Sequence, residues 1–285
     1  MSFQHIVAMA NTYLQRYTGD AFLGQDRSEL HAAAFQGQLM TLYGLIQQGA
    51  DVNKKTSDGV TPLHEACSRG FFYCCELLVK HGADVAAYNI DGSTPLCDAC
   101  CHGNVEIVKF LLSKGADPNP PMARTSPLHE AALRGHTDCV RELIKAGSKL
   151  EVTDGHYGTA LHSACYTGKT ETAEVILNAG GSANAIMNHT SLLHVAVSVN
   201  ASDLVQLLLD YGANIYARNN REKAPFQLAG IDSKTMKILD DHMSHPRPLS
   251  ELCRWRIRRL LGPQRLDKLD KLGLPKVISN YVQFR

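Results

Sequence analysis

The chain has 285 residues, enough for one or two domains, and 44% of them are hydrophobic, which excludes an intrinsically disordered protein. Its net charge of +1 excludes a globally basic protein that coats nucleic acid, and a strongly acidic protein as well. Residues 246–285 nevertheless hold ten Lys and Arg against three Asp and Glu, so this tail differs chemically from the rest.

Targeting signals and the pattern of cysteines indicate the cellular compartment in which the protein is expected. The first twenty residues contain neither a basic stretch nor an apolar run of signal-peptide length. No apolar run approaches the roughly 18 residues that a transmembrane helix needs. The nine cysteines are an odd number and several adjoin in apolar runs, which is more typical of buried thiols than of disulfides. We therefore expect a soluble, reduced protein of the cytoplasm, or of cytoplasm and nucleus, without membrane contact.

From residue 26 the chain repeats one pattern. Tetrapeptides related to Thr-Pro-Leu-His recur at steps of 32 or 33 residues, starting at Ser28, Thr61, Thr94, Ser126, Thr159, Ser191 and, in degenerate form, Ala224. A Gly or Asn that tolerates positive φ then follows and can end a short helix. A second helix with apolar residues at i, i+3 and i+4 comes next, as at Leu42, Leu45 and Ile46, and another glycine closes it. Such a unit cannot bury its apolar face alone, so the copies must stack.

The period, the Thr-Pro-Leu-His opening and the Gly-Ala-Asp-Val-Asn ending resemble ankyrin repeats. The resemblance implies six repeats over residues 26–222 and a degenerate seventh repeat or cap over residues 223–245. Residues 1–25 form either a helix that covers the first repeat or a mobile segment. The expected fold is an all-α ankyrin-repeat solenoid of helix-turn-helix units with β-hairpin tips, followed by a C-terminal domain over residues 246–285.

Two patterns inside the repeats could indicate metal or redox chemistry. A histidine recurs in one slot of five copies, at positions His31, His64, His129, His162 and His194. We interpret these side chains as structural imidazoles bonded to the backbone of neighbouring turns, rather than as metal ligands. Cys97 replaces the histidine in the third copy and forms a Cys-x-x-Cys with Cys100, beside Cys101. Because no second ligand pair follows at the spacing of a zinc finger, a buried thiol is favoured over zinc or redox chemistry. We expect no metal and no cofactor.

The tail over residues 246–285 breaks the repeat. Pro246 and Pro248 separate it from the array, and apolar residues from Leu249 to Leu261 recur at helical spacing. Two shorter apolar segments follow Gly262-Pro263. Because forty residues in three short helices bury little by themselves, they need either the end of the solenoid or a partner protein.

The order of motifs in the tail resembles a three-helix SOCS box. Pro248-Leu249-x-x-x-Cys253-x-x-x-Ile257 matches the Elongin-binding half of that domain. Leu272-Gly273-Leu274-Pro275-x-x-Ile278-x-x-Tyr281 is similar to the cullin-contacting half, with Gly273 in place of the usual proline. The resemblance assigns Elongin C binding to Leu249, Leu252, Cys253 and Ile257. It assigns cullin binding to Leu272, Leu274, Pro275, Ile278 and Tyr281.

Both parts together resemble the ankyrin repeat and SOCS box family. The resemblance implies the substrate-recognition subunit of an E3 ubiquitin ligase, which Elongin B and Elongin C join to a cullin of the fifth type and its RING protein. The ankyrin face would hold an unidentified target protein, which is then ubiquitinated and degraded by the proteasome. We expect no catalysis by the chain itself, because it has no phosphate-binding glycine loop, nucleophile elbow or paired carboxylates at a plausible site.

Three alternative hypotheses about the function of the repeats and the tail stay open. The repeats could form a plain scaffold without any ligase role, or the first tail helix could only cap the solenoid. The tail arginines Arg254, Arg256, Arg258 and Arg259 could form a stripe that binds nucleic acid. That third reading is disfavoured, because only Trp255 supplies an interleaved aromatic ring, and we expect no nucleic-acid partner.

Geometry indicates where a target protein would bind. In a stack of such units, the ends of the first helices and the hairpin tips are expected to line one concave face. Exposed aromatic, Met and Arg residues are frequent hot spots of binding. We therefore expect target contacts from residues of these types and one histidine, namely Arg69, His102, Met122, Arg134, Tyr157 and Tyr166.

Overall fold

The computed structural model describes residues 26–121, 124–155, 157–230 and 233–245, and residues 253, 254, 257, 276, 277 and 282 of the tail. The predicted N-terminal cover over residues 1–25 therefore lies outside the described residues. The chain divides into two compact units, Met1–Pro127 and Leu128–Arg285, each of which holds successive helix pairs.

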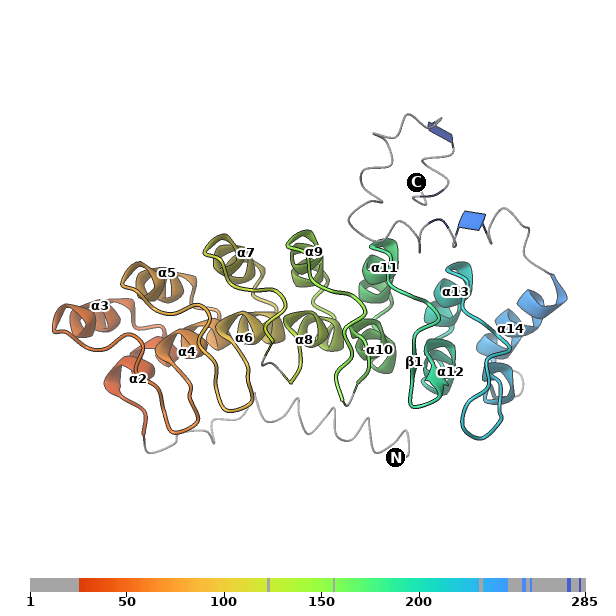
Figure 1. Ribbon diagram of the computed structural model, residues 1–285, viewed down its shortest axis with the longest axis horizontal. Coiled ribbons are helices and arrows are strands. Elements are labelled where there is room, and N and C mark those ends of the chain that lie inside the picture. The colour runs from red at the N-terminus through yellow and green to blue at the C-terminus, as the bar shows by residue number, and fades with distance from the viewer. Residues whose placement is uncertain are drawn as a thin grey trace. The chain divides into compact units, whose positions relative to one another are not determined.

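The first unit contains three helix pairs in two layers (Figure 1). The first helices of the pairs pack side by side, and the second helices form the other layer. The first helices are α2 (Glu29–Gln36), α4 (Pro62–Arg69) and α6 (Pro95–His102). The second helices are α3 (Leu39–Gln47), α5 (Phe72–Lys80) and α7 (Val105–Ser113).

The second unit continues the same alternation. Its helix pairs are α8 (Pro127–Arg134) with α9 (Thr137–Lys145), α10 (Ala160–Tyr166) with α11 (Thr170–Asn178), and α12 (Leu192–Ser198) with α13 (Ser202–Asp210). In the degenerate seventh copy the first helix is only a 3-10 turn, η1 (Pro225–Gln227), and the second helix is α14 (Lys234–Ser244). Regular strand pairing in the described residues is confined to β1 (Ile186–Met187) and β2 (Thr190–Ser191), so most of the described tips are turns.

The predicted starts and ends of the helices are confirmed. Pro62, Pro95 and Pro127 are the first residues of their helices, where the missing N–H costs no hydrogen bond. The glycines that follow first helices adopt positive φ, for example 68° at Gly37, and Asn200 takes the same role at 52°. Small buried residues hold the layers together: eight of the nine cysteines are buried, as the apolar runs predicted, and Cys253 is exposed.

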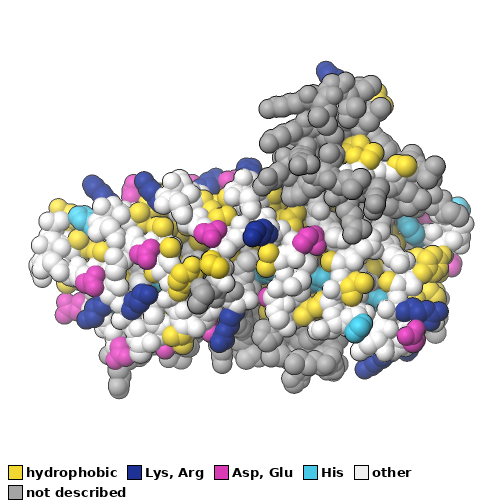
Figure 2. Space-filling model, viewed as in Figure 1, with side chains coloured by type: hydrophobic (Ala, Val, Ile, Leu, Met, Phe, Trp, Pro, Cys, Tyr) yellow, Lys and Arg dark blue, Asp and Glu magenta, His cyan; other side chains and the backbone are white. Residues whose placement is uncertain are grey.

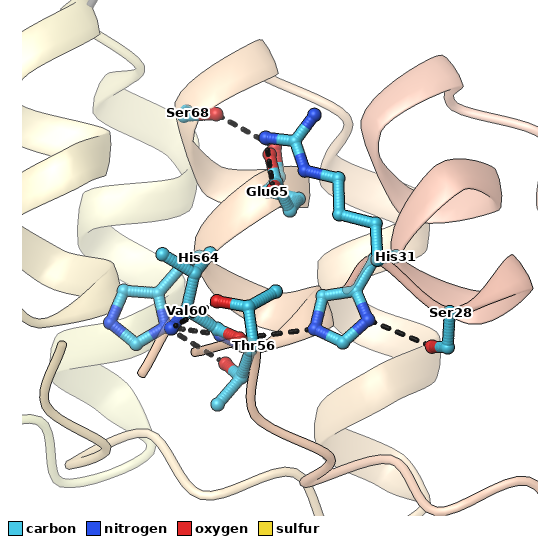
Figure 3. Close-up of polar contacts among 9 residues, drawn as sticks. Ser28, His31, Thr56, Val60, His64, Glu65 and Ser68 are labelled. Atoms are coloured by element: carbon cyan, nitrogen blue, oxygen red, sulfur yellow. Dashed lines mark hydrogen bonds and ion pairs between the residues drawn. The ribbon is translucent and has the colours of Figure 1, made fainter. Parts of the chain in front are cut away.

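The histidine slot links each repeat to the next turn. The Nε2 atoms of four histidines donate to carbonyl oxygens 29 residues further on, in the pairs His31–Val60 (3.0 Å), His64–Ser93 (3.2 Å), His129–Gly158 (2.8 Å) and His194–Lys223 (2.9 Å). Figure 3 shows the ring of His31 between Ser28 and Val60. The Nδ1 atom of His64 accepts from the backbone N–H of Thr61, so the ring is neutral. The predicted structural role of these imidazoles is thus confirmed.

The two 32-residue steps of the repeat are the places where this link changes. One step runs from Thr94 to Ser126, and there Cys97 occupies the slot. Its Sγ makes a long, weak hydrogen bond of 4.0 Å to the Thr125 oxygen. The other runs from Thr159 to Ser191, and there the buried Nε2 of His162 finds no acceptor among the described residues. Both changes thus coincide with a repeat step that is shorter by one residue.

Replacing Gly70 by alanine should destabilise the array more than the same change at Gly115. Both glycines have positive φ, 80° and 89°, which costs alanine about 1–2 kcal/mol. A Cβ at Gly70 would also lie 2.8 Å from Oδ1 of Asn104, whose amide donates to the Cys67 carbonyl, whereas Gly115 has nothing within 4 Å. Urea unfolding should show an extra loss of about 1–2 kcal/mol for Gly70→Ala. Equal losses would contradict the role of this contact between repeats.

Candidate functional site

The last residues of the first helices, which we call helix-end residues, are Gln36, Arg69 and His102 in the first unit, and Arg134, Tyr166 and Ser198 in the second. A glycine with positive φ directly follows four of them, Gln36, Arg69, His102 and Arg134, so that the chain turns away after each of these side chains.

Arg69 is exposed and lies on an aromatic ring. Its guanidinium carbon is 4.6 Å from the centroid of Phe35, and the guanidinium carbon of Arg27 is 5.1 Å from the same centroid. Such cation–π contacts hold a charged group in a defined orientation. The role of Arg27 could not be predicted from the sequence, because no local spacing connects it with a helix-end residue in a later repeat.

A buried carboxylate lies beside this pair of arginines. Glu65, one turn before Arg69 on α4, forms an ion pair with Arg27 at 2.6 Å, and its side chain is only 6% exposed. Burial raises the pKa of the Glu65 carboxyl, and the charges of Arg27 and Arg69 oppose that rise. Arg27 is therefore the direct partner of Glu65, while Arg69 acts on it from a greater distance.

The other predicted arginine and the histidine are held by their own helices. Nδ1 of half-buried His102 donates to the backbone oxygen of Asp98, one turn earlier, at 3.0 Å. Arg134 faces Glu130 at 4.0 Å, and its side chain is 11% exposed. These two side chains offer less charged surface than Arg69 does.

The two predicted tyrosines differ in exposure. Tyr166 is half-buried, and burial raises the pKa of its hydroxyl. Tyr157 is only 6% exposed, and burial together with the charge of Glu130 raises its pKa to about 12. The expected exposure of Tyr157 is wrong: the ring is buried, and the backbone N–H of this residue donates to the Asp154 carboxylate.

Several predicted residues fall outside the described part of the chain. Met122 is one of them. The others are most of the residues assigned to Elongin C or cullin binding, namely Leu249, Leu252, Leu272, Leu274, Pro275, Ile278 and Tyr281. Cys253 and Ile257 are described: both are helical and exposed, and they lie one turn apart. Val277 is 80% exposed and Val282 is buried.

The buried thiols are poor nucleophiles. Sγ of Cys67 lies 3.6 Å from Sγ of Cys75, and burial raises the pKa of Cys67 well above its ordinary value. Thiolate is the reactive form, so this shift suppresses reactivity. In the described ranges, no three His, Cys, Asp or Glu side chains are grouped so as to hold a metal ion. Nor does any described helix have the length and apolar character needed to cross a bilayer.

Comparison with known families identifies both parts of the chain. Residues 30–122 and 128–219 match the model of ankyrin repeats in three copies, and residues 245–283 match the model of the SOCS box.

Curated proteins match over nearly the whole length. Ankyrin repeat and SOCS box protein 5 of Mus musculus is 50% identical over 260 residues, which cover 91% of this chain and 79% of the relative. Ankyrin repeat and SOCS box protein 9 of Mus musculus is 49% identical, with 90% and 88% covered. The crystal structure of the human ASB11 ankyrin repeat domain matches with a TM-score of 0.73 and 35% identity, covering 78% of this chain and all of that domain.

Proposed function

Because the chain belongs to the family of ankyrin repeat and SOCS box proteins, we propose that it is the substrate receptor of an E3 ubiquitin ligase. In this proposal the ankyrin repeats bind the target protein. The SOCS box binds Elongin C, which acts with Elongin B, and a cullin of the fifth type that carries a RING protein. The protein then acts as an adaptor without a catalytic group of its own.

The exposed pair in the tail is the observation that best supports this role. Cys253 and Ile257 present a compact sulfur and an apolar side chain on one helical face, and both are open to solvent. Ile257 is 39% exposed, so that part of its apolar surface is open to contact with a partner. A second polypeptide would bury this face, to which the motif adds Leu249 and Leu252.

The proposed mechanism is proximity. A receptor that holds a target lysine close to an activated ubiquitin thioester raises the effective concentration of the reactants without forming a covalent bond itself. The buried, high-pKa thiols of the repeats agree with this division of labour, because they offer no accessible nucleophile.

The two halves of the SOCS box should be separable by mutation. Replacing Leu274 and Pro275 together by alanine should weaken cullin binding at least about tenfold, because an apolar contact of roughly 1.5 kcal/mol or more is lost. Elongin C should still co-purify with this variant. Binding of both partners can be measured with purified Elongin B/C and the cullin.

A chain that ends at residue 245 is the matched control and should bind neither Elongin C nor the cullin. If the truncated chain still captured both partners, the proposal would fail and the plain scaffold would be favoured. Loss of both partners by Leu274→Ala with Pro275→Ala would show instead that the two halves are not independent.

A further inference from the structure

The described repeats contain an unusual group of charged side chains around the ring of Phe35. Two guanidinium groups, those of Arg27 and Arg69, lie within 5.1 Å of this one ring centroid. The neighbourhood also contains one carboxylate, that of Glu65, which is almost fully covered. Two positive charges and one negative charge therefore leave these three side chains with a net charge of +1.

The structure shows which arginine has the spare charge. Glu65 is bound by Arg27 at 2.6 Å, and both side chains are largely covered, at 6% and 17% exposed. Arg69 has no ion-pair partner among the described residues, and its side chain is exposed. The matching residue of a later repeat, Arg134, instead faces Glu130 and is 11% exposed.

The geometry points to Arg69 as the binding point for an aspartate or glutamate side chain in the target protein. This proposal rests on the proposed role as a substrate receptor and adds the chemistry of the recognised segment. A guanidinium group held on a ring has its N–H fork oriented in advance, so that less entropy is lost when a carboxylate binds to it. Phe35, which is half-buried, supplies an apolar surface beside the charge.

A protein partner fits this surface better than a nucleic acid. Binding to a phosphate backbone depends on several Lys and Arg side chains that act together. On the face shown in Figure 2, basic and acidic side chains are interspersed, and neither sign forms a continuous block. One exposed guanidinium beside an aromatic ring suits a single carboxylate in a peptide.

The test selects random 16-residue peptides displayed on phage against the full chain. Peptides enriched by the unmodified chain should contain Asp or Glu at one preferred position. For a synthetic copy of such a peptide, Arg69→Gln should weaken binding at least about tenfold, as expected for a lost charged hydrogen bond. Arg69→Lys should weaken it less, and Arg69→Glu should change the selected residue to Lys or Arg. Arg141→Gln, on an exposed arginine of α9, is the control and should leave binding unchanged.

Three outcomes would overturn the assignment of Arg69. Selection could yield no preference for acidic residues, or it could yield one that Arg69→Gln and Arg69→Glu leave unchanged. A single-stranded RNA 20-mer could bind in an Arg69-dependent way while peptides do not. Capture of Elongin C is scored on the same preparations, so that a failed ligase role is distinguished from a failed acidic contact: the former loses Elongin C, and the latter loses only the peptide preference.

Discussion

Replacing Leu249 and Cys253 together by alanine should abolish the capture of Elongin C while leaving the repeats folded. Cys253 is exposed in the structure, and the helical spacing of the motif places Leu249 one turn before it. Burial of a leucine at an interface contributes roughly 1.5–3 kcal/mol, and truncating a second contact on the same face adds to the loss. The combined effect should exceed a hundredfold in affinity, since each 1.4 kcal/mol is about tenfold.

Affinity is best measured by calorimetry with purified Elongin B/C, alongside thermal unfolding of the receptor alone. Ser250→Ala is the control, because helical spacing of the motif would place position 250 off the face that Leu249 and Cys253 share. The midpoint of unfolding should be the same for all three chains. Unchanged affinity would refute the assigned face, and a lowered midpoint would mean that this helix packs on the repeats.

Much of the fold follows from single residues whose physical role leaves few choices. The glycines after each helix must accept positive φ, and all of those predicted from the repeat do so. The histidines occupy one slot because only an imidazole both accepts from its own turn and donates to the next, as His64 does. These relations are local or periodic, and a pattern in the sequence can therefore show them.

The candidate site is less predictable because it depends on distant pairs. Arg27 and Glu65 are 38 positions apart, and no period of 33 residues indicates that they would meet. The burial of Tyr157 depends on the fold of its turn, in which its backbone N–H donates to the Asp154 carboxylate. The open Nε2 of His162 lies in a repeat step that is short by one residue, but only the structure shows that no described neighbour accepts from it.

Replacing His64 by alanine should cost about 2–4 kcal/mol at neutral pH. His64 is buried, and its loss leaves a cavity and two backbone groups without partners, the Thr61 N–H and the Ser93 carbonyl. His162→Ala is the matched comparison, because the Nε2 of that histidine has no acceptor in the described structure. Its cost should be smaller by about 1 kcal/mol, the net contribution of one hydrogen bond.

The same variant should change how stability depends on pH. Burial lowers the pKa of His64 from its ordinary value of 6.5 to about 4, so the unfolded chain binds a proton more readily than the folded chain. The contribution of a neutral His64 is complete above about pH 6.5 and is lost as the pH falls toward 4. At pH 5 the unmodified chain should already have lost about 2 kcal/mol through this one group, which His64→Ala cannot lose.

Urea unfolding at pH 7.5 and at pH 5.0 therefore provides the measurement. The difference in stability between the unmodified chain and His64→Ala should shrink at the lower pH, and the same holds for His162→Ala, because burial also lowers the pKa of His162 to about 4. His81→Ala, at an exposed position directly after α5, should follow the unmodified chain at both pH values. Parallel pH curves for the unmodified chain and His64→Ala would mean that this imidazole is not held neutral in the folded protein.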